Sequence, residues 1–141
     1  MAQKVIVAGA YGVIGRAAAL LFAAQPGTEV IGLSRRTGAS MEGVETIAVD
    51  LLDPAQTVAR LSHVRDVSHI VFGAYIEKAT AAEKSTVNVA ILRNLLDAVE
   101  TTSPGLQHVT FYQGGKAYGA DLGPFKTPAR EDDPRLMPPN F

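Results

Sequence analysis

The chain has 141 residues, of which 47% are apolar, with a formal net charge of −1 and no cysteine. This length suits one domain with its own hydrophobic core, and the lack of cysteine excludes disulfides and cysteine-bound metals. No basic cluster exceeds two residues and no predicted helix is long and apolar enough to cross a bilayer, so we expect neither a nucleic-acid nor a membrane partner.

The first informative stretch is a short apolar run followed by spaced glycines. Residues 5–8 are typical of a strand buried on both faces, and this early start leaves no space for a signal peptide, so we expect a cytoplasmic location. Gly9, Gly12 and Gly15 follow with the spacing G-x-x-G-x-x-G, just as a helix pattern begins. A helix N-terminus offers free N–H groups, and glycines let a pyrophosphate approach the backbone. The stretch predicts a dinucleotide-binding loop; a tight turn without a ligand is the alternative.

The helix over 13–25 is apolar on nearly every side, which predicts that it is buried all round. Pro26 and Gly27 end it, and residues 29–33 form a second apolar strand.

The end of this second strand predicts which dinucleotide is bound. In such units it faces the adenosine ribose, roughly 20 residues after the glycine loop, and an acidic residue there selects NAD(H). This chain has Ser34, Arg35 and Arg36 instead, a hydroxyl and two guanidinium groups suited to a phosphate. We therefore predict NADP(H), with an arginine pair that is merely solvated as the alternative.

The next elements are a third strand over 44–49 and a short helix over 54–61. Asp53 is a good N-cap for this helix, which we expect to bury Val58 and Leu61 on one side. Asp50, at the strand end, has two open roles: accepting a hydrogen bond from the adenine amino group, or capping the turn.

The rest of the pattern completes an α/β unit. Residues 68–75 predict a fourth strand that runs into a turn at Gly73 and Ala74, small enough to pass close to the adenosine half of a nucleotide. The capping box from Thr80 to Glu83 starts a helix that reaches about residue 100, and 107–112 form a fifth strand. This order predicts a three-layer, Rossmann-type, doubly wound parallel sheet with strand order 3-2-1-4-5 and a ligand crevice at the strands' carboxyl ends.

The domain prediction has two parts. Residues 1–118 form the NADP-binding Rossmann domain, and the proline-rich segment 119–141 forms a loop near the active site, which we expect to lead into a C-terminal part that the sequence does not include.

Several motifs resemble the extended short-chain dehydrogenase/reductase superfamily. These are the glycine loop, Asp50-Leu51 and the helix text over 88–98. Further motifs resemble its branch of NADPH-dependent enone reductases, which includes progesterone 5β-reductase and iridoid synthase: Ser34-Arg35-Arg36 and the segments 115–119, 123–125 and 138–141.

The resemblance implies a role for each matching residue. The pyrophosphate group comprises Gly9, Tyr11, Gly12, Val13, Ile14 and Gly15, and the 2′-phosphate group comprises Ser34, Arg35 and Arg36. Asp50 and Leu51 would border the adenine, Ala74 and Tyr75 would pass the cofactor, and Gln113 would lie toward the nicotinamide. Lys116 matches the branch's catalytic lysine. Asn88 would lie near the active site, with an ordinary polar helix residue as an equal alternative.

Two departures shape the functional prediction. Gly114 stands where most members of the superfamily have a serine or threonine hydroxyl, as in the enone-reductase branch. The family's catalytic tyrosine would fall after Phe141, and neither Tyr112 nor Tyr118 occupies its position, so we expect this chain to be inactive alone.

The favoured function is therefore the NADP(H)-binding portion of an oxidoreductase that transfers a hydride to a small carbonyl or enone substrate. The alternatives are a nucleotide-sugar epimerase or dehydratase, and a non-catalytic NADP(H) sensor. The histidines show no metal-ligand spacing, so no metal site is predicted. The long helix over 81–100 resembles the superfamily's dimer helix, which makes a homodimer possible, although its apolar stripe could equally face only the sheet.

Overall fold

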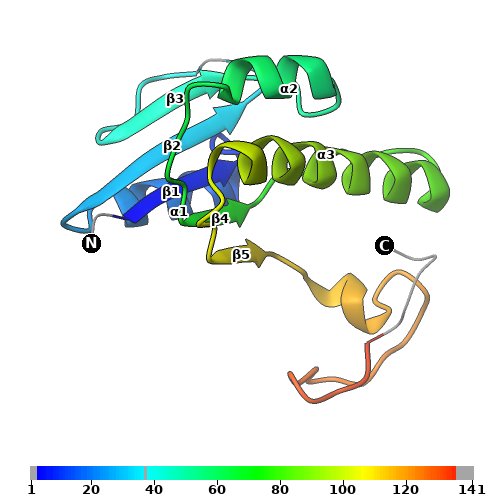
Figure 1. Cartoon of the computed structure of the whole chain (residues 1–141). Coiled ribbons are helices and arrows are strands. Elements are labelled where there is room, and N and C mark those ends of the chain that lie inside the picture. The colour runs from blue at the N-terminus through cyan, green and yellow to red at the C-terminus, as the bar shows by residue number, and fades with distance from the viewer. Residues whose placement is uncertain (1–2, 37, 136–141) are drawn as a thin grey trace.

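The protein is built on a five-stranded parallel sheet with the order β3-β2-β1-β4-β5, as the sequence predicts (Figure 1). The computed structural model describes residues 3–36 and 38–135. The strands are β1 (Gln3–Ala8), β2 (Thr28–Ser34), β3 (Val44–Ala48), β4 (His69–Phe72) and β5 (His108–Phe111). The helices are α1 (Val13–Ala23), α2 (Pro54–Leu61), α3 (Ala81–Thr102) and the 3₁₀ helix η1 (Gly115–Tyr118). The predicted fold class is confirmed.

The central strand β1 divides its side chains between two cores, because successive strand residues point to opposite faces. Val5 and Val7 pack with Ala18 and Ala19 of α1 on one face. Ile6 belongs to the core on the other face, which α2 and α3 cover. Helices therefore lie on both faces of the sheet, and the middle strand is buried from both sides.

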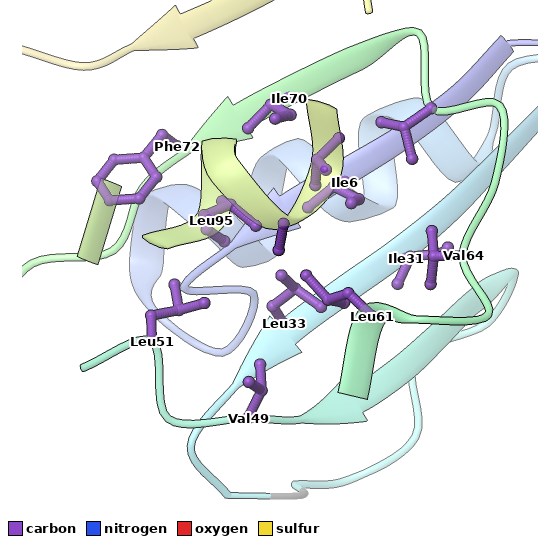
Figure 2. Packing of buried hydrophobic residues seen from close by; sticks show 14 of the residues in the cluster. Ile6, Ile31, Leu33, Val49, Leu51, Leu61, Val64, Ile70, Phe72 and Leu95 are labelled. Carbon is purple, nitrogen blue, oxygen red and sulfur yellow. The ribbon is translucent and has the colours of Figure 1, made fainter. Parts of the chain in front are cut away.

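The larger core lies beneath α2 and α3 (Figure 2). Figure 2 shows Leu95 of α3 over the strands that carry Ile6 and Ile70, with Leu61 of α2 beside Leu33. All five side chains are fully or almost fully buried. Fully burying one such side chain contributes about 1.5–3 kcal/mol, so this core stabilises the strand ends that border the crevice.

The prediction that α1 is buried all round is wrong. Its buried residues are the small ones, Gly15, Ala18 and Ala19, whereas the Leu21 side chain is 62% exposed. Small residues let the helix lie close to the sheet, and Phe22 packs against the edge of this core. The other large apolar side chains of α1, namely Val13, Ile14, Leu20 and Leu21, are exposed.

Helix α2 also differs from its prediction on one residue. Leu61 is fully buried as predicted, but Val58 is 56% exposed and Thr57 takes its place in the interior. Thr57 lies one helical turn before Leu61, on the same face. Its hydroxyl donates to the Asp53 carbonyl oxygen at 2.8 Å, so a polar side chain is buried without an unpaired group.

The ends of α3 follow from its sequence. Thr80 and Glu83 form the predicted capping box, and Ser103 ends the helix. Ser103 is buried, and its hydroxyl accepts a hydrogen bond from the Val67 N–H at 3.0 Å, which ties the helix end to the segment before β4.

The chain beyond β5 leaves the sheet. Figure 1 shows this segment, orange to red, extending away at the β5 edge. Its described part from 119 to 135 contains no helix or strand. The motif at 138–141 lies outside the described residues. Within 3–36 and 38–135, no helix has the length and apolar character needed to cross a bilayer.

Candidate functional site

The glycine loop joins β1 to α1 at the point where the carboxyl ends of β1 and β4 meet. Gly9 has a φ of +76°, and a Cβ built there would lie 2.8 Å from the Gly73 carbonyl oxygen and 2.9 Å from the Ala74 Cα. A Cβ on Gly15 would lie 2.1 Å from the Gly9 carbonyl oxygen. Both positions therefore require glycine, because the loop is pressed between the start of α1 and the end of β4.

The start of α1 is free to hold an anion. Gly12 is its N-cap, no side chain caps the helix, and the first turn contains no acidic residue. The first N–H groups of a helix have no intrahelical partner and carry partial positive charge. An anion above Gly12 would therefore meet donors that no side chain occupies.

A first cavity, of about 310 Å³, lies between this loop and the ends of β2, β3 and β4. Its lining includes nine of the predicted residues: Gly9, Tyr11, Gly12, Ser34, Arg35, Asp50, Leu51, Ala74 and Tyr75. It also includes five residues absent from the predicted set: Leu33, Val49, Gly73, Ile76 and Ile91. Gly73 was expected only as a small turn residue close to the adenosine. Leu33, Val49 and Ile91 lie in predicted strands or in a predicted helix, and only the fold shows that they also form a cavity wall.

A second cavity, of about 500 Å³, continues from the first toward η1. The two share Gly73, Ala74 and Tyr75, so they form one crevice along the strand ends. The apolar wall of the second cavity comes from Ile14, Phe72, Phe111, Tyr112 and Ala117. Its polar lining comprises Lys84, Asn88, Gln113, Lys116 and Asp121. The predicted residues Ile14, Gln113 and Lys116 thus lie together at this end.

Three predicted residues line neither cavity: Val13, Gly15 and Arg36. The Val13 side chain is 93% exposed, and its backbone N–H lies at the helix start, where the first N–H groups have no intrahelical partner. Gly15 acts through the close approach described above. Arg36 is exposed beside Arg35.

Asp50 performs one of its two candidate roles in the structure. Its Oδ1 accepts from the Leu52 N–H at 3.0 Å, and its own N–H donates to Gln56 Oε1 at 2.6 Å. Asp50 therefore caps the turn through Oδ1 while lining the first cavity, and its Oδ2 accepts no hydrogen bond from the described residues. The adenine contact stays a prediction.

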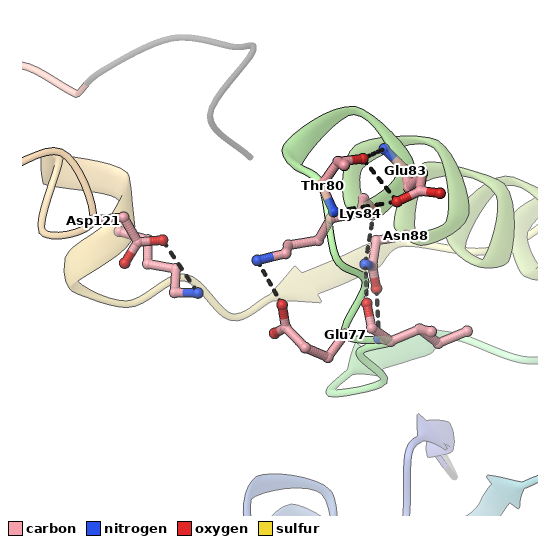
Figure 3. Close-up of polar contacts among 8 residues, drawn as sticks. Glu77, Thr80, Glu83, Lys84, Asn88 and Asp121 are labelled. Carbon is pink, nitrogen blue, oxygen red and sulfur yellow. Dashed lines mark hydrogen bonds and ion pairs between the residues drawn. The ribbon is translucent and has the colours of Figure 1, made fainter.

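Asn88 holds the loop that follows β4 (Figure 3). Its Oδ1 accepts from the Ile76 N–H and its Nδ2 donates to the Ile76 carbonyl oxygen, both at 2.8 Å. Nδ2 also donates to the Lys84 carbonyl oxygen at 2.8 Å. Asn88 therefore forms hydrogen bonds with the backbone of Ile76, which lines the first cavity, while Asn88 itself lines the second cavity.

Two lysines border the second cavity, each beside a carboxylate (Figure 3). Lys84 Nζ lies 2.6 Å from Glu77 Oε1, and Lys116 Nζ lies 3.2 Å from Asp121 Oδ2. Hydrogen bonds from Lys84 and then Tyr75 hold the pKa of Glu77 below its ordinary value, and Glu77 in turn raises the pKa of Lys84. The Lys84 ammonium group therefore stays charged at neutral pH.

Sequence reasoning missed Lys84, although a signal was present. Lys84 precedes Asn88 by four residues on α3, so both must lie on the same face of the helix. If Asn88 lies beside the crevice, Lys84 is therefore expected to lie beside it as well. Among the described residues, no three His, Asp or Glu side chains gather in a way that could hold a metal ion.

Comparison with known families gives a match over nearly the whole chain. Residues 5–140 match the model described as the NAD dependent epimerase/dehydratase family. The chain is 32% identical to (S)-8-oxocitronellyl enol synthase from Catharanthus roseus and 31% identical to 3-oxo-Delta(4,5)-steroid 5-beta-reductase from Arabidopsis thaliana. Each alignment covers 96% of this chain but only 37% and 38% of the relative, so the chain spans less than two fifths of their length.

Solved structures share the fold. A short-chain dehydrogenase/reductase superfamily protein from Agrobacterium tumefaciens with bound NAD has a TM-score of 0.71 and 25% identity, covering 98% of this chain and 40% of that one. The Bordetella bronchiseptica enzyme WbmH, in complex with NAD+, has a TM-score of 0.70 and 21% identity, covering 95% and 46%. The second likeness supports the fold alone.

Proposed function

The chain belongs to the NAD dependent epimerase/dehydratase family, and from this premise we propose that it is the NADP(H)-binding portion of an oxidoreductase. The whole enzyme would transfer a hydride to a carbonyl or enone substrate. The observation that carries the choice of cofactor is the end of β2, where Ser34 and Arg35 line the first cavity and no acidic residue takes their place.

The dinucleotide would lie along the carboxyl ends of the strands. Its pyrophosphate would sit over Gly12 at the start of α1, where the helix N-terminus is uncapped. Its adenosine would occupy the first cavity, bordered by Asp50 and Leu51, and the nicotinamide would reach past Tyr75 into the second cavity. The shared lining of the two cavities supports this continuous path.

The 2′-phosphate would bind beside Ser34 and Arg35. A guanidinium can form two parallel hydrogen bonds to phosphate oxygens, and each charge-assisted bond contributes about 1.5–3 kcal/mol. Arg35 is exposed at the rim of the cavity and makes no ion pair among the described residues, so it can turn toward a ligand. Arg36 is a second candidate ligand of the 2′-phosphate, because its exposed side chain can move toward the cavity that Arg35 lines.

The substrate would bind in the second cavity, against the wall formed by Ile14, Phe111 and Tyr112. When bound, the nicotinamide supplies the hydride. Negative charge then builds on the substrate oxygen, and an ammonium group at the polar end of the cavity would stabilise it. Lys116 is our candidate, because it lines this cavity and its partner Asp121 is close enough to hold the side chain in place.

The names of the relatives favour a reductase over an epimerase. An enol synthase and a steroid 5-beta-reductase each match 96% of the chain. Gly114, which lines the second cavity, provides no hydroxyl where an epimerase would need one. The domain boundary near residue 118, a homodimer and a cytoplasmic location stay predictions.

A binding titration tests the cofactor. The 141-residue chain should bind NADPH more tightly than NADH, measured by the fluorescence of the reduced nicotinamide. Arg35→Ala should weaken NADPH binding by about 10- to 100-fold and leave NADH nearly unchanged, since only NADPH has the phosphate. Arg60→Ala is the matched control, because Arg60 is exposed on α2 and lines neither cavity. Equal affinity for the two dinucleotides would refute the NADP(H) assignment.

A further inference from the structure

Tyr11 lies in the glycine loop, and its side chain is packed against other residues instead of extending into solvent. The ring packs against the core beneath α1 and also lines the first cavity. Its hydroxyl oxygen is buried and has no hydrogen-bond partner among the described residues. The packing of the ring against this core is therefore what holds the side chain in this position.

The ring of Tyr11 also contacts Gly38, which lies in the loop that joins β2 to β3. A Cβ built on Gly38 would lie 2.5 Å from Tyr11 Cε1, 2.7 Å from Cδ1 and 2.9 Å from Cζ. The ring of Tyr11 therefore occupies the space that a side chain at this position would need.

The loop held in this way carries Arg35. It leaves β2 after Ser34, passes Gly38 against the ring, and is anchored further on by Met41, whose side chain is buried in the core beneath α1. The ring of Tyr11 thus connects the glycine loop to the loop between β2 and Met41. The glycine loop is the proposed pyrophosphate site, and the loop after β2 carries the proposed 2′-phosphate site, so the ring lies between the two parts of the proposed cofactor site.

We propose that Tyr11 is a positioning residue that sets the preference for NADPH over NADH. By fixing Gly38, the ring holds Arg35 at the rim of the first cavity, so that less conformational freedom is lost when a phosphate binds. The inference rests on the proposed NADP(H) function and assigns a specificity role to the ring, and none to the hydroxyl.

Four variants of the 141-residue chain test this, with dissociation constants measured for NADPH and NADH. Tyr11→Ala should weaken NADPH binding at least about tenfold more than NADH binding, because the loop is released. Tyr11→Phe should keep the wild-type preference, since it keeps the ring. Gly38→Ala should resemble Tyr11→Ala, because the added Cβ pushes the loop off the ring. The double variant should be no worse than Tyr11→Ala alone, because without the ring the Cβ meets no obstacle. Gly105→Ala is the control, because a Cβ added at Gly105 would meet no atom within 4 Å beyond its chain neighbours.

A second readout needs no cofactor. Trypsin cleaves after arginine, so the rate of cleavage after Arg35 and Arg36 reports how mobile the loop is. Cleavage should be faster in Tyr11→Ala and Gly38→Ala, and unchanged in Tyr11→Phe and Gly105→Ala.

The outcomes separate the two proposals. A wild-type chain without NADPH preference would refute the proposed cofactor, and the cleavage rates would still decide whether the ring holds the loop. A wild-type chain that prefers NADPH, with the same preference in Tyr11→Ala and Gly38→Ala, would overturn the role of Tyr11 alone. Equal loss of preference in Tyr11→Phe and Tyr11→Ala would also overturn it, because the hydroxyl would then be responsible.

Discussion

Gly15→Ala is the sharpest test of the phosphate-binding geometry. The new Cβ would lie 2.1 Å from the Gly9 carbonyl oxygen, 2.7 Å from the Gly9 carbonyl carbon and 3.1 Å from the Ala10 nitrogen. All three are backbone atoms, so no side chain can rotate away to relieve the clash. Gly9 has no room to retreat either, since the end of β4 lies directly behind it at Gly73.

The expected size of the effect follows from two opposing terms. Forcing an extra methyl group into a packed site costs about 1–3 kcal/mol. Alanine is better than glycine inside a helix by about 1 kcal/mol, and Gly15 lies in the first turn of α1. Because the clash is with backbone, we take the upper part of the range and expect a net loss of about 1–2 kcal/mol in the free energy of unfolding.

Urea unfolding followed by circular dichroism measures this loss, and an NADPH titration measures the effect on the site. The start of α1 must move away from Gly9, so binding should fall at least about tenfold, since the pyrophosphate donors are displaced. Gly105→Ala is again the control, because it has open space around it. A Gly15→Ala variant with wild-type stability and wild-type NADPH affinity would refute the argument that helix and loop touch here.

The remaining predictions concern the core and one ion pair. Leu95→Ala should lower the free energy of unfolding by about 2–5 kcal/mol in urea, because the side chain is fully buried, and a loss below 1 kcal/mol would contradict the packing. Ser103→Ala should cost about 1–3 kcal/mol in the same assay, because it leaves the Val67 N–H unpaired; a variant as stable as wild type would show that water replaces the hydroxyl. Lys84→Met should raise the pKa of Glu77 toward its ordinary value in an NMR titration, and an unchanged pKa would exclude the ion pair as its cause. The pKa of Glu77 is lower in the folded protein than in the unfolded chain, so the ion pair stabilises the fold at any pH above the unfolded pKa. This stabilisation is lost as the pH falls through the folded pKa. The effect is small because the Glu77 side chain is exposed.

Much of the fold could be predicted from local patterns. The apolar runs at β1 and β2 and the capping residues Asp53 and Thr80 each act within a few residues, so their elements appear where the sequence places them. The strand order follows from right-handed crossovers between parallel strands, a rule that needs only the order of the elements. Because that rule also puts β1 beside β4, the glycine loop that follows β1 lies at the carboxyl ends of the strands, as predicted.

The tertiary structure alone decided which side chains are covered and which meet. An apolar composition made α1 look buried, but burial depends on what packs against each face, and the small residues face the sheet. The contact between Tyr11 and Gly38 joins two loops, and neither residue has a pattern that identifies the other. Lys84 reached the second cavity through the orientation of α3 over the sheet. The sequence by itself thus determined the elements, their order and the position of the glycine loop, because these depend on short-range preferences. The shape of the crevice depends instead on distances between segments that are far apart in the chain.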